Sequence, residues 1–235
     1  SRGLGDVYKR QVLQLPESLG ARTERIELPV GQGTEGEPFV DIGALRATTG
    51  VVALDPSYGN TGCGKSPVCF IHGEDGILRY RGYPIEQLAT LSFEEVAYLV
   101  IYGELPDESA LSVFNAGLTM ANQSVPEGLR NLIGCLPPGT HPMDALQTGV
   151  AAMSGFFPQF LNAGSQTMIS ASIMHAIGVP PVIAAAHYRN SINEPFIPPR
   201  ADLGFAENFL YMMFGEDALV KDIIEARVNF KDRTL

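Results

Sequence analysis

From about Tyr83 onward, apolar residues recur every three to four positions, which is typical of amphipathic helices. Ser92 and Glu95 form a capping box before an apolar run, and Gly103 follows it, so a helix is predicted between them. The same period predicts helices at 85–88, from 107 with Leu111, Phe114 and Leu118 on one face, and at 127–135, 142–157, 163–177, 181–191, 203–214 and 217–230. Short links containing Gly and Pro join these segments, which favours an all-α, bundle-like domain.

The part of the chain before Tyr83 has a different pattern, with short β-type runs and many Gly and Pro residues. Runs that favour strands lie at 25–30, 38–42, 50–54 and 67–72. The turn cluster Gly73–Gly76 separates the last run from Ile77–Arg81, which predicts a β-hairpin. The sequence therefore predicts an unstructured tail over residues 1–23, a small β-rich region over 24–82 and a helical region over 83–235.

The stretch from Ala145 to Tyr188 contains no Asp, Glu, Lys or Arg. Polar residues and prolines, including Pro158 and Pro180, interrupt it, so it holds no run of 18 apolar residues and a membrane-spanning helix is not expected. A helix that lacks a charged face must be buried on more than one side. Two interpretations stay open: the centre of a large domain, or contact with a partner subunit.

The charge of the chain excludes several classes of partner. Acidic residues outnumber basic ones by 26 to 16, which gives a net charge of −10 and a pI of about 4.8. No basic surface is therefore expected that could neutralise a nucleic-acid backbone or an anionic membrane. A composition of 45% hydrophobic residues also provides for a sizeable core and excludes disorder as the main state.

The three cysteines, Cys63, Cys69 and Cys135, are too few and odd in number for a secreted disulfide framework. They favour a reducing compartment, so we expect the cytoplasm, with the mitochondrial matrix kept open. Cys63, Cys69 and His72 fit no standard zinc spacing and lack a fourth ligand. No metal site is expected.

Two glycine-rich segments match phosphate-binding patterns. Gly59–Ser66 fits the P-loop pattern, but Pro67 and a β-type run follow at the place where a helix N-terminus is needed. Gly31–Gly36 matches the dinucleotide fingerprint, with Asp55 near the distance expected for a ribose contact, yet residues 37–40 continue as extended chain. Both segments are predicted to be ordinary loops, and nucleotide binding at Gly59–Ser66 is the alternative.

The remaining histidines do not assemble a recognisable site. His141 precedes Pro142 and is expected to begin a helix, and His175 is expected to be a hydrogen-bonded histidine of the core. The cluster His187–Arg189 could reach an anion or interact with a helix C-terminus. No nucleophile, base and orienting group come together.

Several segments, taken in order, resemble the citrate synthase family. They are Asp75–Ile85, Phe93–Pro106 with its Gly103-Glu104-Leu105-Pro106 ending, His141–Met143, Pro199–Leu203 and Asn208–Phe214. The resemblance covers residues 25–235 and corresponds to the family's N-terminal half. It implies a mainly α, multi-helix large domain that is incomplete and is preceded by a small N-terminal β region with a hairpin.

The resemblance also implies the condensation of acetyl-CoA with oxaloacetate and water to citrate and CoA, in the tricarboxylic acid cycle. In the family an Asp removes a methyl proton, one His stabilises the enol, a second His polarises the ketone, and arginines hold the substrate carboxylates. These catalytic residues lie beyond Leu235, so none is expected within this chain, and the chain alone is expected to be inactive. Acetyl-CoA is a substrate rather than a bound cofactor, no permanent cofactor or metal is implied, and the CoA-binding residues stay open.

The family further implies a homodimer or higher homo-oligomer, to which the region 145–188 contributes. A 2-methylcitrate synthase acting on propionyl-CoA is the close alternative, and a non-catalytic helical interaction module is the alternative if the protein ends at Leu235. Residues 1–11 match nothing in the family and resemble translated adaptor sequence, so we expect them to be non-native.

Overall fold

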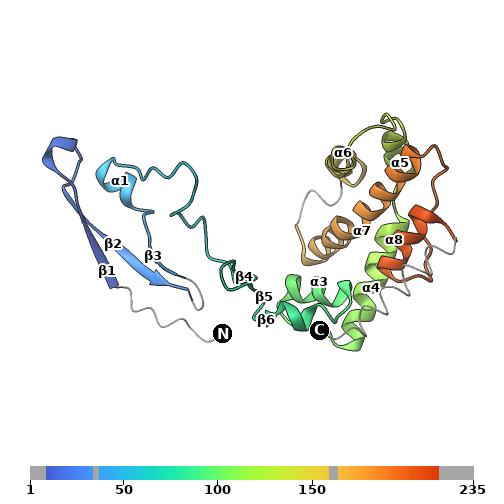
Figure 1. The fold of residues 1–235 in the computed structure, drawn as a ribbon, viewed down its shortest axis with the longest axis horizontal. Coiled ribbons are helices and arrows are strands. Elements are labelled where there is room, and N and C mark those ends of the chain that lie inside the picture. Colours follow the sequence, from blue (N-terminus) through green and yellow to red (C-terminus); the bar gives the residue numbers. More distant parts are fainter. Residues whose placement is uncertain (1–8, 34–36, 159–163, 217–235) are drawn as a thin grey trace. The chain divides into compact units, whose positions relative to one another are not determined.

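The computed structural model describes residues 9–33, 37–158 and 164–216. The chain divides into two compact units, Ser1–Ile85 and Glu86–Leu235, and Figure 1 traces the elements of each. The first unit holds two small antiparallel sheets, and the second is helical throughout its described part. The mainly α fold with a small β region, expected from the sequence, is confirmed.

The first sheet has the strand order β1-β2-β3, with β1 at Lys9–Gln14, β2 at Arg25–Gln32 and β3 at Pro38–Val40. Burial alternates along the start of β2, so Ile26 and Leu28 face a small core with Leu45 of helix α1, which spans Leu45–Thr49. The η1 turn, a 3₁₀ helix at Glu17–Leu19, lies between β1 and β2. Sequence patterns did not predict α1.

The expected unstructured tail over residues 1–23 is wrong for residues 9–14. Strand β1 pairs with β2 along its whole length, Leu13 packs on the small core, and Arg10 forms an ion pair with Glu27 at 2.9 Å. An edge strand with two adjacent apolar residues, Val12 and Leu13, shows no alternation, which is why its pattern carries no strand signal. Residues 1–8 lie outside the described part.

The second sheet confirms the predicted hairpin. Strands β4 (Cys69–His72), β5 (Ile77–Tyr80) and β6 (Tyr83–Pro84) are antiparallel, and Gly76 in the β4–β5 turn has φ of 66°. The expected strand at 50–54 is wrong. Gly50, with φ of 81°, ends α1. Residues 51–54 after it pair with no described strand, and Leu54 is 88% exposed.

The helical unit begins with α2 (Ile85–Leu88), α3 (Phe93–Tyr102), α4 (Glu108–Gln123) and α5 (Glu127–Gly134). The capping box of Ser92 and Glu95 is present at the start of α3, and Gly103 ends it with φ of 92°. Helix α4 begins at its Asp107 cap, and Phe114 and Leu118 are buried on one face, as the sequence predicts.

The later helices are α6 (Pro142–Phe156), α7 (Gln166–Ser191) and α8 (Phe205–Phe214). Two helices were expected at 163–177 and 181–191, and this division is wrong, because α7 continues through Pro180 and Pro181. Proline removes an N–H donor but its fixed φ is helical, and packing against α4, α6 and α8 holds the helix on both sides of the pair. The helix expected at 217–230 lies outside the described residues.

Helix α7 supplies the centre of the helical core, since Val179, Val182 and Ala185 have no exposed surface. Residues from α5, α7 and α8 make up the same cluster. Among the described helices, α7 is also long and apolar enough to span a membrane, with a mean hydropathy of 1.6 in its best window. Length and composition alone give that result, and central helices of folded cores give it as well, so no membrane role follows.

Candidate functional site

The glycine-rich segment Gly59–Ser66 is a loop whose amide groups bind a carboxylate of the chain itself. Asp55 accepts hydrogen bonds from the amides of Gly59 (3.2 Å) and Asn60 (2.8 Å) and from the Thr61 hydroxyl (2.6 Å). These donors, with that of Thr61 largest, hold the pKa of Asp55 below its usual 3.8. The loop, predicted from the sequence, is confirmed, and its amides already serve an internal anion. In the second glycine-rich segment, Gly31 and Gln32 lie in β2 and pair with Phe39 and Pro38 of β3, so the loop predicted there is wrong for these two residues. Residues 34–36 lie outside the described part.

The three histidines of the helical unit serve the fold. His141 caps α6 by accepting from the Met143 amide at 3.2 Å, which confirms its predicted place at a helix start. His175, partly buried, bonds to the Ala171 carbonyl (2.8 Å) and the Ser124 hydroxyl (3.1 Å), as expected of a core histidine. His187 is 4% exposed, and its Nε2 donates to the Thr140 carbonyl at 3.0 Å.

The cluster His187–Arg189 does not assemble an anion site. Arg189 donates to the carbonyls of Pro195 (2.9 Å) and Met213 (3.4 Å), and it pairs with Glu194 at 3.1 Å. It therefore binds α7 to the segment after it and to α8, which agrees with the helix-terminus interpretation.

The cysteines are free and exposed, and no group of three or more potential metal ligands occurs among the described residues. His72 lies beside Asp75, with 3.3 Å between Nδ1 and the nearer carboxylate oxygen. This pair belongs to the hairpin turn.

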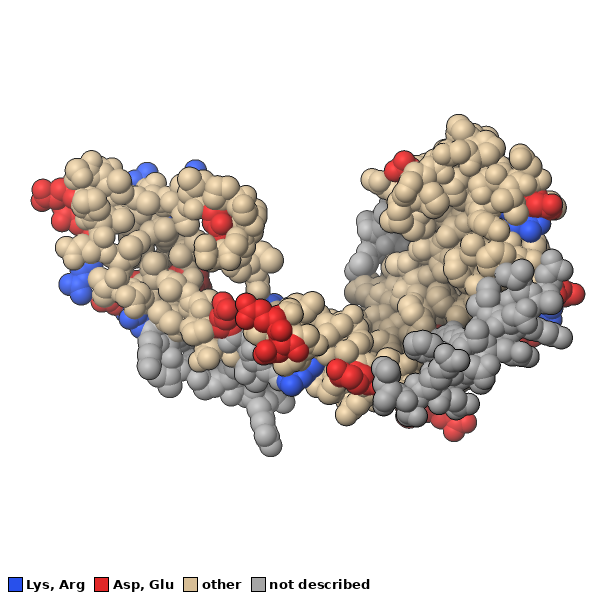
Figure 2. All heavy atoms as spheres, viewed as in Figure 1, with Lys and Arg blue, Asp and Glu red and all other residues tan. Residues whose placement is uncertain are grey.

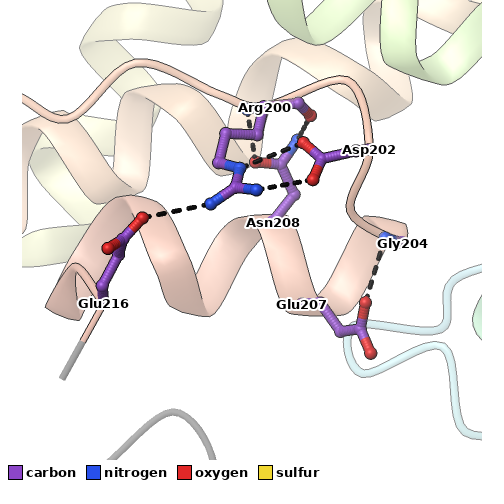
Figure 3. Close-up of polar contacts among 6 residues, drawn as sticks. All are labelled: Arg200, Asp202, Gly204, Glu207, Asn208 and Glu216. Carbon is purple, nitrogen blue, oxygen red and sulfur yellow. Dashed lines mark hydrogen bonds and ion pairs between the residues drawn. The ribbon is translucent and has the colours of Figure 1, made fainter. Parts of the chain in front are cut away.

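Arg200 is the central residue of a polar network in the helical unit, and it lies in a segment that carries the family resemblance. Its guanidinium donates to Asp202 (3.0 Å from Nε to Oδ1) and to Glu216 (3.2 Å), as Figure 3 shows. The guanidinium also lies over the Tyr211 ring, 5.4 Å from its centroid. The hydrogen bonds and charge of Arg200 lower the pKa of Asp202, and the same pair raises the pKa of Arg200. All these charges are at least two fifths exposed, so they orient the segment more than they stabilise it.

Asn208 gives the network its buried anchor. Its side chain, 1% exposed, accepts from the Arg200 amide (3.0 Å) and donates to the Arg200 carbonyl (2.9 Å), as Figure 3 shows. Both backbone groups of Arg200 are thus satisfied by one amide on α8. The start of α8 is fixed in addition by Glu94 of α3, which accepts from the Phe205 amide at 3.3 Å, and by stacking of Phe93 on Phe205.

A second candidate site is a hollow of about 560 Å³ between α5 and the C-terminal end of α7. Arg130 contributes to its lining, and its guanidinium lies 5.0 Å from the centroid of the Phe196 ring. The Arg130 Nε is buried without a hydrogen-bond partner among the described residues. A buried donor left unpaired costs about 1–3 kcal/mol, so this arrangement is one that ordinary packing avoids.

Arg130 is not indicated by any sequence pattern, and Asn208 enters the sequence analysis only as part of the resembling segment Asn208–Phe214. Each depends on a partner distant along the chain or on the other side of a loop, and no local spacing indicates that contact. An arginine two residues after Glu127–Gly128 in an amphipathic helix is typical of a solvated face. Its position against Phe196 is visible only in the fold.

The fold is thus a helical scaffold with two small sheets before it, and its described residues form polar networks without a nucleophile, base and orienting group. Comparison with protein families identifies the scaffold. The family model named "Citrate synthase, C-terminal domain" matches residues 57–229. The chain belongs to the citrate synthase family.

Two curated relatives give the degree of similarity. Citrate synthase 1 of Mycobacterium tuberculosis is 39% identical over 191 residues, which are 81% of this chain and 44% of the relative. The peroxisomal citrate synthase 1 of Arabidopsis thaliana is 38% identical over 172 residues, which are 70% of this chain and 36% of the relative. The chain spans less than half of the length of these relatives.

Solved structures agree with the family. The citrate synthase of Thermotoga maritima has a TM-score of 0.60 at 30% identity, covering 73% of this chain and 44% of its own. That of Pyrobaculum aerophilum has a TM-score of 0.60 at 32% identity, covering 81% and 46%. The Thermoplasma acidophilum enzyme, in a ternary complex with carboxymethyl coenzyme A and oxaloacetate, has a TM-score of 0.61 at 27% identity, covering 68% and 42%.

Proposed function

We propose that this chain acts in citrate synthesis, the condensation of acetyl-CoA with oxaloacetate and water to citrate and CoA, as part of a protein about twice its length. The carrying observation is the family match over residues 57–229, with 39% identity to the M. tuberculosis relative over 44% of that relative's length. The T. acidophilum neighbour, crystallised with oxaloacetate and a coenzyme A derivative, supports the two substrate classes.

The chemistry of the reaction explains why the chain alone is proposed to be inactive. The methyl group of acetyl-CoA is a very weak acid, so its deprotonation needs a positioned base and preorganised donors for the enolate. We place the family's His, His and Asp beyond Leu235, and each of the three histidines of the helical unit uses a ring nitrogen in a capping or core hydrogen bond. The proposed role of this part is to build the scaffold on which that machinery is held.

We also propose that the longer protein is a homodimer or higher homo-oligomer through α6 and α7. Between them these helices carry two charged residues, Asp144 near the start of α6 and Arg189 near the end of α7. Apolar side chains on the outer face of α6 are exposed, namely Met143 at 61% and Val150 at 44%. In the view of Figure 2, most of the surface around α6 is neither acidic nor basic. Charge-depleted, apolar helix faces are typical of obligate subunit interfaces.

The activity test compares two purified proteins: the 235-residue chain, and the same chain extended through the downstream reading frame. Release of CoA thiol from acetyl-CoA with oxaloacetate is followed with a thiol reagent. We expect turnover from the extended protein and a rate at the no-enzyme blank from the short chain, because catalytic groups that act as a unit leave little rate when removed. Absence of CoA release by the extended protein contradicts the proposed function. Turnover by the short chain contradicts the proposed position of the catalytic residues.

The same assay with propionyl-CoA separates the two acyl-chain alternatives. A higher kcat/KM for propionyl-CoA would assign the 2-methylcitrate reaction. We propose the cytoplasm as compartment, consistent with free, exposed thiols. The Arabidopsis relative carries a peroxisomal name, so fractionation of the source cells is the direct check.

A further inference from the structure

The hollow between α5 and the end of α7 has the dimensions and lining of a small-molecule site. Its volume of about 560 Å³ lies within the range of about 300–1,000 Å³ that metabolite pockets occupy. Side chains from α5 and from the last two turns of α7 line it together with the segment that follows, and Arg130, Asn131, Cys135, Asn190, Glu194 and Phe196 are among them. The lining combines one aromatic ring with several polar groups that converge from three segments.

Arg130 is the unusual member of this lining. Within the described chain it forms no ion pair and its side chain makes no hydrogen bond, although its Nε is buried. The Phe196 ring, 5.0 Å from the guanidinium carbon to the centroid, holds the guanidinium in place. A guanidinium fixed on an aromatic ring with its donors unused is preorganised to bind a planar anion in a bidentate manner.

The surrounding charges select the class of anion. Glu194 is already paired with Arg189, and Glu127 adds a further carboxylate to the lining. The hollow therefore offers one unpaired cation among acidic neighbours, which disfavours a doubly charged phosphate and suits a singly charged carboxylate. Asn190, whose amide nitrogen is bonded to the Leu136 carbonyl, is held rigidly beside it.

We propose that this hollow binds a small monocarboxylate through Arg130. The inference concerns binding by the described residues alone, so it does not depend on the proposed catalytic function. Removal of the guanidinium is expected to abolish binding, while the helices that form the hollow stay in place.

Cys135 provides the readout, because its exposed thiol lies in the same lining. In the 235-residue chain with Cys63→Ser and Cys69→Ser, the reaction of Cys135 with a chromogenic disulfide is timed with added butyrate. We expect butyrate at about twice its dissociation constant to slow the reaction about threefold, as mass action requires for a blocked thiol. Butyramide, equal in shape but uncharged, and inorganic phosphate are expected to leave the rate unchanged at the same ionic strength.

Two arginine variants decide whether Arg130 carries the binding. Arg130→Gln is expected to lose the protection, and Arg46→Gln, on α1 of the other unit, is expected to keep it. Saturation-transfer NMR on the butyrate methyl protons gives a second, thiol-independent readout. If Arg130→Gln does not fold, Arg130→Lys takes its place and should weaken the protection. Absence of protection and of transfer in the parent chain, equal protection by phosphate, or retained protection in Arg130→Gln each overturns the proposal.

Discussion

The buried side chain of Asn208 forms hydrogen bonds with both the amide and the carbonyl of Arg200. Truncation of that side chain leaves both backbone groups without this partner. We predict that Asn208→Ala lowers the free energy of unfolding by about 2–4 kcal/mol, because a partly buried amide and a partly buried carbonyl lose their partners together. Urea denaturation followed by circular dichroism measures the change.

Asn115→Ala is the matched control for Asn208→Ala. Asn115 lies exposed on α4, and its replacement should change the unfolding free energy by no more than about 0.5 kcal/mol. Equal losses in the two variants would show that the Arg200 backbone finds other partners when Asn208 is absent.

The Asp55 loop gives a prediction for pH. The folded-state pKa of this carboxyl is below 3.8, since Thr61 and the loop amides donate to its charged form. Its contribution to stability is therefore complete above pH 3.8 and is lost as the pH falls through the folded pKa. The stability advantage of the parent chain over Asp55→Asn should shrink on acidification from about pH 5 to about pH 2, as measured by urea midpoints. An advantage that stays constant over this range would contradict the loop's use of the charged form.

At the scale of elements, glycines set how closely the helices approach. A Cβ on Gly178 of α7 would lie 2.8 Å from the Ala121 Cβ and 3.1 Å from the Leu118 carbonyl oxygen of α4. We predict that Gly178→Ala lowers the thermal midpoint, at a cost of about 1–3 kcal/mol, because backbone cannot yield as a flexible side chain does.

Gly155→Ala on α6 separates this steric effect from helix propensity. No atom of the described residues lies within 4 Å of a Cβ at Gly155, so alanine there should leave stability unchanged or raise it by up to about 1 kcal/mol. A gain in both variants would mean that α4 and α7 separate easily.

The elements that the sequence predicted are those with local chemical signals. The Ser92–Glu95 box, the Asp107 cap and Gly103 each fix a helix end through bonds to neighbours within four residues. The failures have non-local causes. Strand β1 exists because β2 pairs with it, and α7 continues through Pro180 because α4, α5, α6 and α8 pack against it.

The candidate sites divide in the same way. The sequence indicated that Gly59–Ser66 lacks the helix that a phosphate site needs. Only the fold shows that the Asp55 carboxylate accepts the hydrogen bonds of this loop. Arg130 of α5 contacts the ring of Phe196, which lies 66 positions further along the chain. A contact between residues so far apart produces no local pattern in the sequence that could predict it.

At the scale of the whole molecule, α6 has one face packed in the core and one exposed apolar face. Its inner face belongs to the protein's own core, where Ala145 is fully buried and Ala152 packs against the central cluster. Its outer face exposes Met143 and Val150. Substitutions on the two faces should therefore have different consequences.

Ala152→Glu tests the inner face. An unpaired carboxylate pressed against the cluster around Val182 and Ile183 should cost a few kcal/mol, about the value expected for a buried charge without a partner. The expected result is a lower melting temperature in the full-length enzyme, measured by calorimetry. An unchanged melting temperature and oligomeric state would mean that this side of α6 is not buried.

Val150→Glu tests the outer face in the same full-length enzyme. Because Val150 is 44% exposed within one chain, a charge there should leave the protomer folded, yet it should be unfavourable in an apolar interface between copies. We expect the variant to sediment as a monomer at concentrations where the parent forms the proposed dimer. Val113→Glu on α4, where the valine is 71% exposed, is the control and should remain a dimer. If sedimentation velocity finds both variants dimeric, α6 does not form the interface, and if both dissociate, the effect follows from added charge rather than from the α6 surface.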